Sequence, residues 1–176
     1  MLALAVAASL LAPGPVTPPT SGTVTVVVTD RDEDARVGDR PFADAVGQAL
    51  GEARFTLMPQ PGHSRYVAEV SVKREGRGLV TAKAPTGRAQ AAIGSWGPTV
   101  SVPLGSKKTQ LHDLVLTTLT VRIVGAADRR QVWTGSAVTA QAEGTQAGAP
   151  STVALKLARA VIAAYPYSLA TPVSVP

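Results

Sequence analysis

The sequence predicts an α+β protein with a mixed or antiparallel sheet of about five strands and two helices packed on one face of it. Strand-like segments dominate the chain, and a helical period occurs in only two segments. The order along the chain is strand, helix, two strands, loop, strand hairpin and helix. A parallel nucleotide-binding sheet would need strands and helices in regular alternation, which this order does not have.

The N-terminal elements are a strand, a helix and a short strand. Residues 23–29, TVTVVVT, are rich in β-branched side chains, which favour strands. Residues 41–53 are expected to form a helix that begins at Pro41, because proline suits the first helical turn and apolar residues recur at helical spacing. These apolar residues are Phe42, Val46, Leu50 and Ala53. Residues 54–58 predict a short strand that Pro59 ends.

The middle of the chain predicts a strand followed by an irregular segment. Residues 66–73 alternate apolar and polar side chains, which is typical of a half-buried strand. From 75 to 98 this alternation gives way to five glycines, two prolines and scattered basic residues, so we expect a mobile excursion there, which could extend a hairpin. Residues 100–104 add a short strand.

The C-terminal half carries the strongest strand signal of the chain. Residues 114–124, LVLTTLTVRIV, and residues 130–141 are joined by the turn GAADR and predict a long antiparallel hairpin. Residues 151–165 have the apolar face of a helix, with Ser151 as its cap and Pro166 as its end.

The chain divides into a leader, a linker, one domain and a tail. Residues 1–12 contain an uncharged apolar run with the length of a signal-peptide core, too short to span a bilayer. Residues 13–22 form a Pro-rich linker, 23–166 a single α+β domain and 167–176 a flexible tail. We therefore expect an exported protein of the periplasm or outer envelope of a Gram-negative bacterium, with no transmembrane span in the mature chain. The alternative is an apolar N-terminal strand or helix of a cytoplasmic protein.

The net charge of the chain indicates which class of binding partner to expect. Its 17 Lys and Arg residues against 12 Asp and Glu residues give a net charge of +5, which favours anionic neighbours. A patch for an anionic partner is predicted from the basic residues of the middle of the chain: Lys73, Arg74, Arg77, Lys83, Arg88, Lys107 and Lys108. Nucleic acid is not expected, because the leader implies export and only Trp96 lies among these residues for base stacking. An envelope protein or an anionic envelope polymer is the expected partner.

The sequence assigns no catalytic, cofactor-binding or metal-binding residue. The chain has no cysteine, which excludes disulfides, thiolate metal sites, cysteine catalysis and a lipidated cysteine anchor. Asp30, Asp32 and Asp34 alternate as at the start of a calcium loop. The glycine and the bidentate glutamate that such a loop requires are replaced by Ala35 and Pro41, so these aspartates are interpreted as solvated loop charges.

Several segments between residues 23 and 166 together resemble a family of bacterial envelope proteins catalogued as domain of unknown function 4136. The segments are FADAVGQAL, YVAEVSV, the hairpin LTVRIVGAADRRQVWTGSA and a closing helix that ends in AAYP. The most specific is VWTGSA, with Val132, Trp133 and Gly135 after a polar turn. The resemblance implies a small secreted protein without an established enzyme activity. The lipobox cysteine that many relatives carry is absent here, and Trp133 is expected to anchor the core.

Three functions remain open from the sequence. The leading hypothesis is a non-enzymatic accessory or binding domain in envelope assembly or maintenance, which binds through the sheet edge or the basic segment. The second is a small envelope hydrolase that uses His63 with Ser64, or His112 with Asp113, although no nucleophile motif surrounds either pair. The third is docking by strand addition in outer-membrane assembly, which proline or charge at the sheet edge would oppose.

Overall fold

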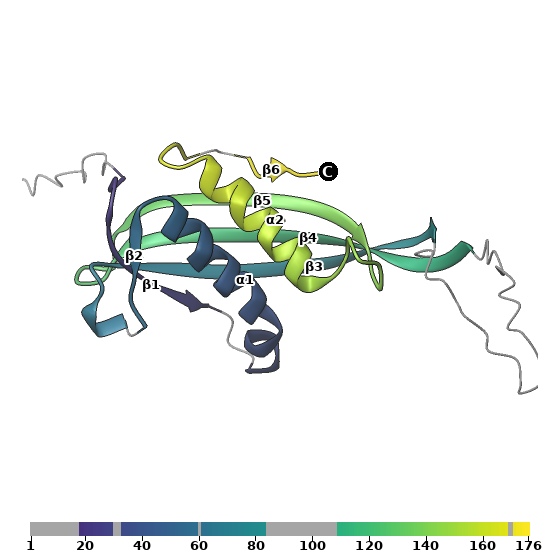
Figure 1. Cartoon of the computed structure of the whole chain (residues 1–176), viewed down its shortest axis with the longest axis horizontal. Coiled ribbons are helices and arrows are strands. Elements are labelled where there is room, and N and C mark those ends of the chain that lie inside the picture. Colours follow the sequence, from purple (N-terminus) through teal and green to yellow (C-terminus); the bar gives the residue numbers. More distant parts are fainter. Residues whose placement is uncertain (1–17, 30–32, 60, 84–108, 169–170) are drawn as a thin grey trace, which may run out of the picture.

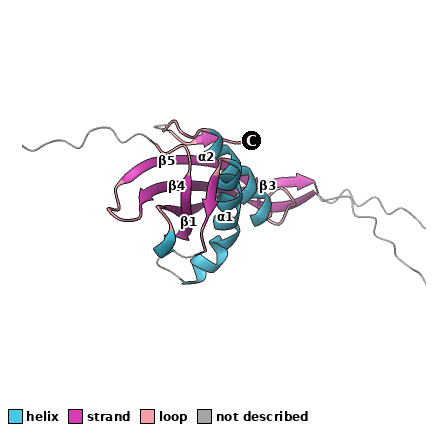
Figure 2. Ribbon diagram, turned by 60° about the vertical axis from the view of Figure 1, so that its left-hand side comes forward, coloured by secondary structure: helices cyan, strands magenta, loops and turns pink. Residues whose placement is uncertain are grey.

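Two helices cover one face of a six-stranded mixed sheet, and no helix of the described part of the chain lies over the other face (Figures 1 and 2). This arrangement, seen in a computed structural model, confirms the predicted class with one strand more than expected. The structure describes residues 18–29, 33–59, 61–83, 109–168 and 171–176. Within these ranges no helix combines the length and the apolar character needed to cross a membrane.

The six strands follow the order β2-β1-β3-β4-β5-β6 across the sheet. Their bounds are β1 Gly22–Val28, β2 Phe55–Leu57, β3 Tyr66–Lys83, β4 Thr109–Gly125, β5 Gln131–Ala142 and β6 Val173–Ser174. The strand β1 pairs parallel with β2 and β3, the strands β3, β4 and β5 pair antiparallel, and β6 pairs parallel with β5. The predicted hairpin is therefore present as β4 and β5, and the predicted strand at 54–58 is present as β2.

The strand β3 continues ten residues beyond the predicted strand at 66–73, so up to Lys83 the excursion expected from residue 75 takes the form of an extended hairpin with β4. The register of β3 against β4 shifts between Gly76 and Leu79, and Gly78 has a φ of 106°. Glycine adopts such a backbone without strain, so the glycines form a bulge inside the strand instead of ending it. Beyond this bulge the two strands project past the helices (Figure 1). Residues 84–98 and the strand predicted at 100–104 lie outside the described residues.

The helix α1, Glu33–Glu52, begins eight residues before Pro41, so the predicted start of this helix was wrong. An interior proline removes one backbone hydrogen bond and does not necessarily end a helix when tertiary contacts hold both sides of it. Here Phe42, just after the proline, is 1% exposed, and Asp39, two residues before it, is 2% exposed and forms an ion pair with Arg74 of β3 at 2.9 Å.

The helix α2, Pro150–Ala163, buries an apolar face against β4 and β5, as its sequence predicted. Its N-cap is Ala149 and Pro150 occupies the first turn, so the cap predicted at Ser151 was wrong. Proline suits the first helical position, because its fixed φ matches the helix and its missing N–H would have no partner within the helix. The C-terminal tail is also better held than expected, since β6 pairs with β5, and Val173 and Val175 pack against the core.

Trp133 anchors the core, as predicted, with 1% of its surface exposed. Its ring packs edge-on against Tyr165 at a centroid distance of 5.2 Å, and its indole Nε1 donates a hydrogen bond to the Tyr167 carbonyl at 3.2 Å. The Tyr165 hydroxyl donates to the carbonyl of Pro19. These contacts join β5, the end of α2 and the segment that leads into β1.

Candidate functional site

The face of the sheet without a helix, called here the open face, carries polar side chains on its central strands. Strand side chains alternate between faces, so the buried core residues of β3, β4 and β5 place the intervening residues on the open face. Pairing in register sets Glu69 opposite Arg122, Ser71 opposite Thr120, Lys73 opposite Thr118 and Glu75 opposite Leu116.

Glu69 is the centre of one ion-pair cluster on this face. Its side chain is only 5% exposed, and Arg122 on β4 donates to its Oε2 from Nε at 2.8 Å. Arg129, in the turn between β4 and β5, donates to Oε1 at 2.5 Å. Arg129 has a φ of 56°, a left-handed backbone that disfavours non-glycine residues. The two guanidinium side chains are still 51% and 62% exposed, so their outer N–H groups face solvent.

Glu75 is the centre of a second cluster on the same strand. Lys73 lies 2.6 Å and Arg77 lies 2.8 Å from its carboxylate. The hydrogen bond and the positive charge of Lys73, together with the charge of Arg77, hold the pKa of Glu75 below its usual value. This carboxylate therefore stays ionised at neutral pH, and the cluster has one more cation than anion.

Hydroxyl side chains occupy the open face between the two clusters. Ser71, Thr120 and Ser136 are paired in register across β3, β4 and β5, and Thr118 and Thr134 lie one row to either side. Glu69 and Glu75 are six residues apart in one strand, which corresponds to about 20 Å at the usual rise per residue. We call the two clusters and the hydroxyl rows between them the cationic strip. Its four basic residues and two carboxylates leave a surplus of two positive charges.

The predicted basic patch is only partly described. Lys73 and Arg77 belong to the cationic strip, whereas Arg74 points to the helix-covered face, because successive strand residues alternate. The side chain of Lys83 and all of Arg88, Lys107 and Lys108 lie outside the described residues, so the patch as a whole stays a prediction. The sequence reasoning missed Arg122 and Arg129. The alternation of β3 placed Glu69 on a polar face, but its partners are 53 and 60 residues away along the chain.

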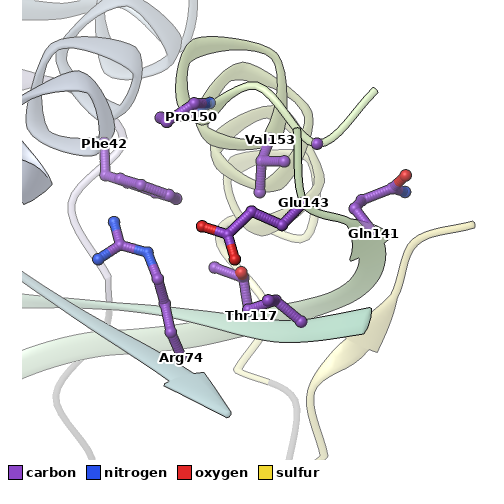
Figure 3. Close-up of a pocket in the computed structure, with 9 residues that line it drawn as sticks. Phe42, Arg74, Thr117, Gln141, Glu143, Pro150 and Val153 are labelled. Atoms are coloured by element: carbon purple, nitrogen blue, oxygen red, sulfur yellow. The ribbon is translucent and has the colours of Figure 1, made fainter. Parts of the chain in front are cut away.

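A second feature is a pocket of about 80 Å³ on the helix-covered side of the sheet (Figure 3). Its lining comes from both helices, three strands and the loop after β5: Phe42, Arg74, Val115, Thr117, Gln141, Glu143, Gly148, Pro150 and Val153. The guanidinium of Arg74 and the carboxylate of Glu143 point toward the same space. No ion pair joins them among the described residues, because Arg74 is held by Asp39 and lies over the ring of Phe42, 5.2 Å from its centroid.

The geometry gives the hydrolase hypothesis no support. His112 Nδ1 donates to the backbone carbonyl of Glu143 at 2.7 Å, which ties the ring to the loop after β5. Asp113 is the next residue of the same strand, so its side chain points to the other face and is not placed to orient the imidazole. His63 is exposed, whereas Ser64 beside it is 8% exposed. Within the described part of the chain, no group of three or more His, Asp or Glu residues is arranged to hold a metal ion.

Comparison with known proteins gives distant structural similarity only. No protein-family model matches the chain, and no curated protein matches it. A PelC dodecamer from Paraburkholderia phytofirmans is 14% identical with a TM-score of 0.44, over 83% of this chain and 90% of that one. The lipoprotein GNA1162 from Neisseria meningitidis is 11% identical with a TM-score of 0.39, over 77% and 92%. Protein XCC0632 from Xanthomonas campestris, of family DUF330, is 11% identical with a TM-score of 0.40, over 85% and 84%. None of these similarities assigns a role to a residue of this chain.

Proposed function

We propose that this protein is an exported, non-enzymatic binding domain of a bacterial cell envelope, which holds an anionic envelope polymer on the open face of its sheet. The observation that supports this function best is the cationic strip, with a surplus positive charge at each end and hydroxyls between. The apolar run of residues 1–12 and the resemblance to domain of unknown function 4136 support the envelope location and a role in envelope assembly or maintenance.

The chemistry of the cationic strip suits a hydrated acidic polymer. Guanidinium groups bind carboxylates and phosphates through paired N–H donors, and Arg122 and Arg129 keep donors exposed after binding Glu69. The hydroxyls of the rows between the clusters match the hydroxyls of a polysaccharide. Two cationic ends about 20 Å apart suit a chain with repeated charges better than a single small anion.

The ends of the sheet give less support to docking by strand addition. The outermost strands β2 and β6 have three and two residues, and Pro59 and Pro172 flank them. Short edge strands bounded by proline are typical of sheets that avoid pairing with another chain. Among the described residues, β3 beyond Val70 and most of β5 have no further strand beside them, so the preference for the open face rests on the cationic strip.

The binding test is a titration of the full chain with polygalacturonate at low ionic strength, with neutral dextran as a comparison. Polygalacturonate should bind and dextran should not. Lys73→Gln combined with Arg129→Gln should weaken binding by roughly fivefold to thirtyfold, taking about 0.5–1 kcal/mol for each exposed ion pair. Lys156→Gln combined with Arg159→Gln removes two charges from α2 and serves as the matched control. Equal losses in the two double variants would show attraction by net charge alone and would contradict a defined surface.

The location is tested separately, by fractionation of producing cells and measurement of the intact mass. Loss of a leader that ends near Ala12 or within residues 13–22, with the product outside the cytoplasm, is the expected result. A full-length cytoplasmic product would rule out the envelope function.

A further inference from the structure

We infer that the pocket between the helices and the sheet binds a small free α-amino acid, with its ammonium group on Glu143 and its carboxylate on Arg74. This site lies on the opposite side of the sheet from the cationic strip and does not depend on the proposed function.

The two charged groups of the pocket are fixed independently of each other. Arg74 is positioned by Asp39, which is 2% exposed and accepts a hydrogen bond from its guanidinium at 2.9 Å, and by the ring of Phe42. The Arg74 side chain is nevertheless 42% exposed, so part of the guanidinium remains available to a ligand. A buried carboxylate partner makes this arginine a prepared anion-binding group.

Glu143 is fixed through its backbone. Its N–H donates to the carbonyl of Asp113 at 2.8 Å, and its own carbonyl accepts from His112 at 2.7 Å. The loop that follows is closed by Thr145, whose hydroxyl donates to the Ala142 carbonyl at 2.6 Å and accepts from the N–H of Gly148 at 3.0 Å. A side chain at Gly148 would collide with the carbonyl oxygen of Ala142, which explains glycine there. The carboxylate of Glu143 is thereby aimed at the pocket without an ion-pair partner among the described residues (Figure 3).

The electrostatics of the pocket select a ligand with both charges. Arg74 and Glu143 bring one positive and one negative charge to the lining of the pocket. An isolated anion would therefore meet repulsion from Glu143, and an isolated ammonium ion would leave the exposed side of Arg74 unused. A zwitterion places each charge against its complement. The hydroxyl of Thr117 adds a hydrogen-bonding group beside the Glu143 carboxylate, whereas the Gln141 amide points away from it and donates to Thr139 (Figure 3).

The size and walls of the pocket restrict the side chain of the ligand. A volume of about 80 Å³ is small and favours a ligand of few non-hydrogen atoms. Phe42, Val115, Pro150 and Val153 supply apolar walls. Glycine or alanine fits these dimensions, whereas a leucine side chain would have to project into solvent.

The test is a titration of the full chain with glycine, followed by the NMR signals of the Val115, Thr117 and Val153 methyl groups and by calorimetry. Glycine should shift these signals with a dissociation constant in the millimolar range. Acetate and methylammonium, which each carry one of the two charges, should bind at least tenfold more weakly. Glu143→Gln should weaken glycine binding at least tenfold, and Glu143→Asp should retain part of it. Glu52→Gln, which removes an exposed carboxylate at the end of α1, is the matched control and should leave the affinity unchanged.

Three outcomes would overturn the inference. The first is no shift of the pocket methyl groups at glycine concentrations that would saturate a millimolar site. The second is binding of acetate as tight as that of glycine, which would indicate an anion site at Arg74 alone. The third is an unchanged glycine affinity in a folded Glu143→Gln variant.

Discussion

Gly135 leaves the space that the ring of Trp133 occupies in the core. A Cβ atom added at Gly135 would lie 2.5 Å from Cη2 of Trp133 and 3.2 Å from Cγ1 of Val161. Neither neighbour has room to move, because Trp133 is 1% and Val161 is 0% exposed. The glycine is therefore required by the indole ring that lies over it, and its backbone φ is ordinary.

Gly135→Ala should lower the free energy of unfolding by about 1–3 kcal/mol, the usual cost of overpacking a filled core. Gly47→Ala is the matched control in α1, where the added Cβ would meet Leu57 at 3.6 Å, an ordinary contact. Alanine has the higher helix propensity, so this variant should gain about 0.5–1 kcal/mol. Urea denaturation measures both. An unchanged stability of Gly135→Ala would mean that the Trp133 ring shifts without cost.

Tyr165 gives the protein a specific sensitivity to alkaline pH. Burial, with a smaller contribution from Tyr66, raises the pKa of Tyr165 to about 12 from the ordinary value of 10.0. Below pH 10.0 the phenol is neutral in the folded and the unfolded chain, so its contribution to stability is fully present there. Above that pH the unfolded chain ionises first, and stability should fall until the pH passes about 12. Tyr165→Phe should show a shallower fall when the free energy of unfolding is followed against pH. A parallel fall in both proteins would assign the alkaline sensitivity to other groups.

At the scale of elements, the hairpin of β4 and β5 positions the arginines of the open face. Its turn is closed by hydrogen bonds from Gly125 N–H to the Arg130 carbonyl at 2.9 Å and from Arg129 N–H to the Gly125 carbonyl at 3.0 Å. Asp128 accepts from the N–H of Arg130 at 3.1 Å. The turn thereby brings Arg129 back over β3, where it shares the buried carboxylate of Glu69 with Arg122.

Arg122→Ala should destabilise the protein by about 1–3 kcal/mol, because Glu69 would lose one of its two partners while remaining buried. Arg130→Ala removes an exposed arginine from the same turn and should change stability by less than about 0.5 kcal/mol. Thermal and urea denaturation of the two variants supply the comparison. Similar effects in both would show that the buried carboxylate does not need Arg122.

The sequence predicted the elements whose signal is local and repeated. The alternation at 66–73 and 114–124 and the helical period at 151–165 identified β3, β4 and α2. The predicted bounds of elements were wrong where one or two residues were interpreted as the start or end of an element. Pro41 predicts the start of a helix, and the glycines after residue 75 predict an irregular excursion, yet contacts with distant segments carry both elements through.

The candidate sites were harder to predict, because they depend on register. Nothing near Glu69 in the sequence names Arg122 or Arg129, and only the pairing of β3 with β4 and the path of the turn bring them together. The pocket requires Arg74 of β3 to meet residues from two helices and the loop after β5. Of the predicted basic patch, Lys73 and Arg77 belong to the cationic strip. The two arginines that bind the buried Glu69 come from β4 and the turn after it.

At the scale of the whole molecule, the sheet separates the two proposed binding surfaces. The cationic strip lies on the open face, and the pocket lies between the helices and the other face. Lys73 and Arg74 are neighbours in β3 but belong to different surfaces, so the peptide backbone is the shortest path between them. The two surfaces share no side chain among the described residues.

Glycine and polygalacturonate should therefore bind independently, and saturating glycine should change the affinity for the polymer by less than about twofold, a coupling below the range of allosteric systems. Added salt should distinguish glycine binding from polymer binding. The attraction between the protein and a long charged chain is largely screened beyond a Debye length of about 8 Å at physiological ionic strength. Polymer binding should weaken steeply with added sodium chloride, whereas the affinity for glycine, a ligand without net charge held in a partly enclosed pocket, should change little. Calorimetric titrations of each ligand with and without the other, at two salt concentrations, measure the effect of each ligand on the affinity for the other and the salt dependence of both affinities. Direct competition would show that the polymer reaches Arg74, and the open face would then not be its only contact.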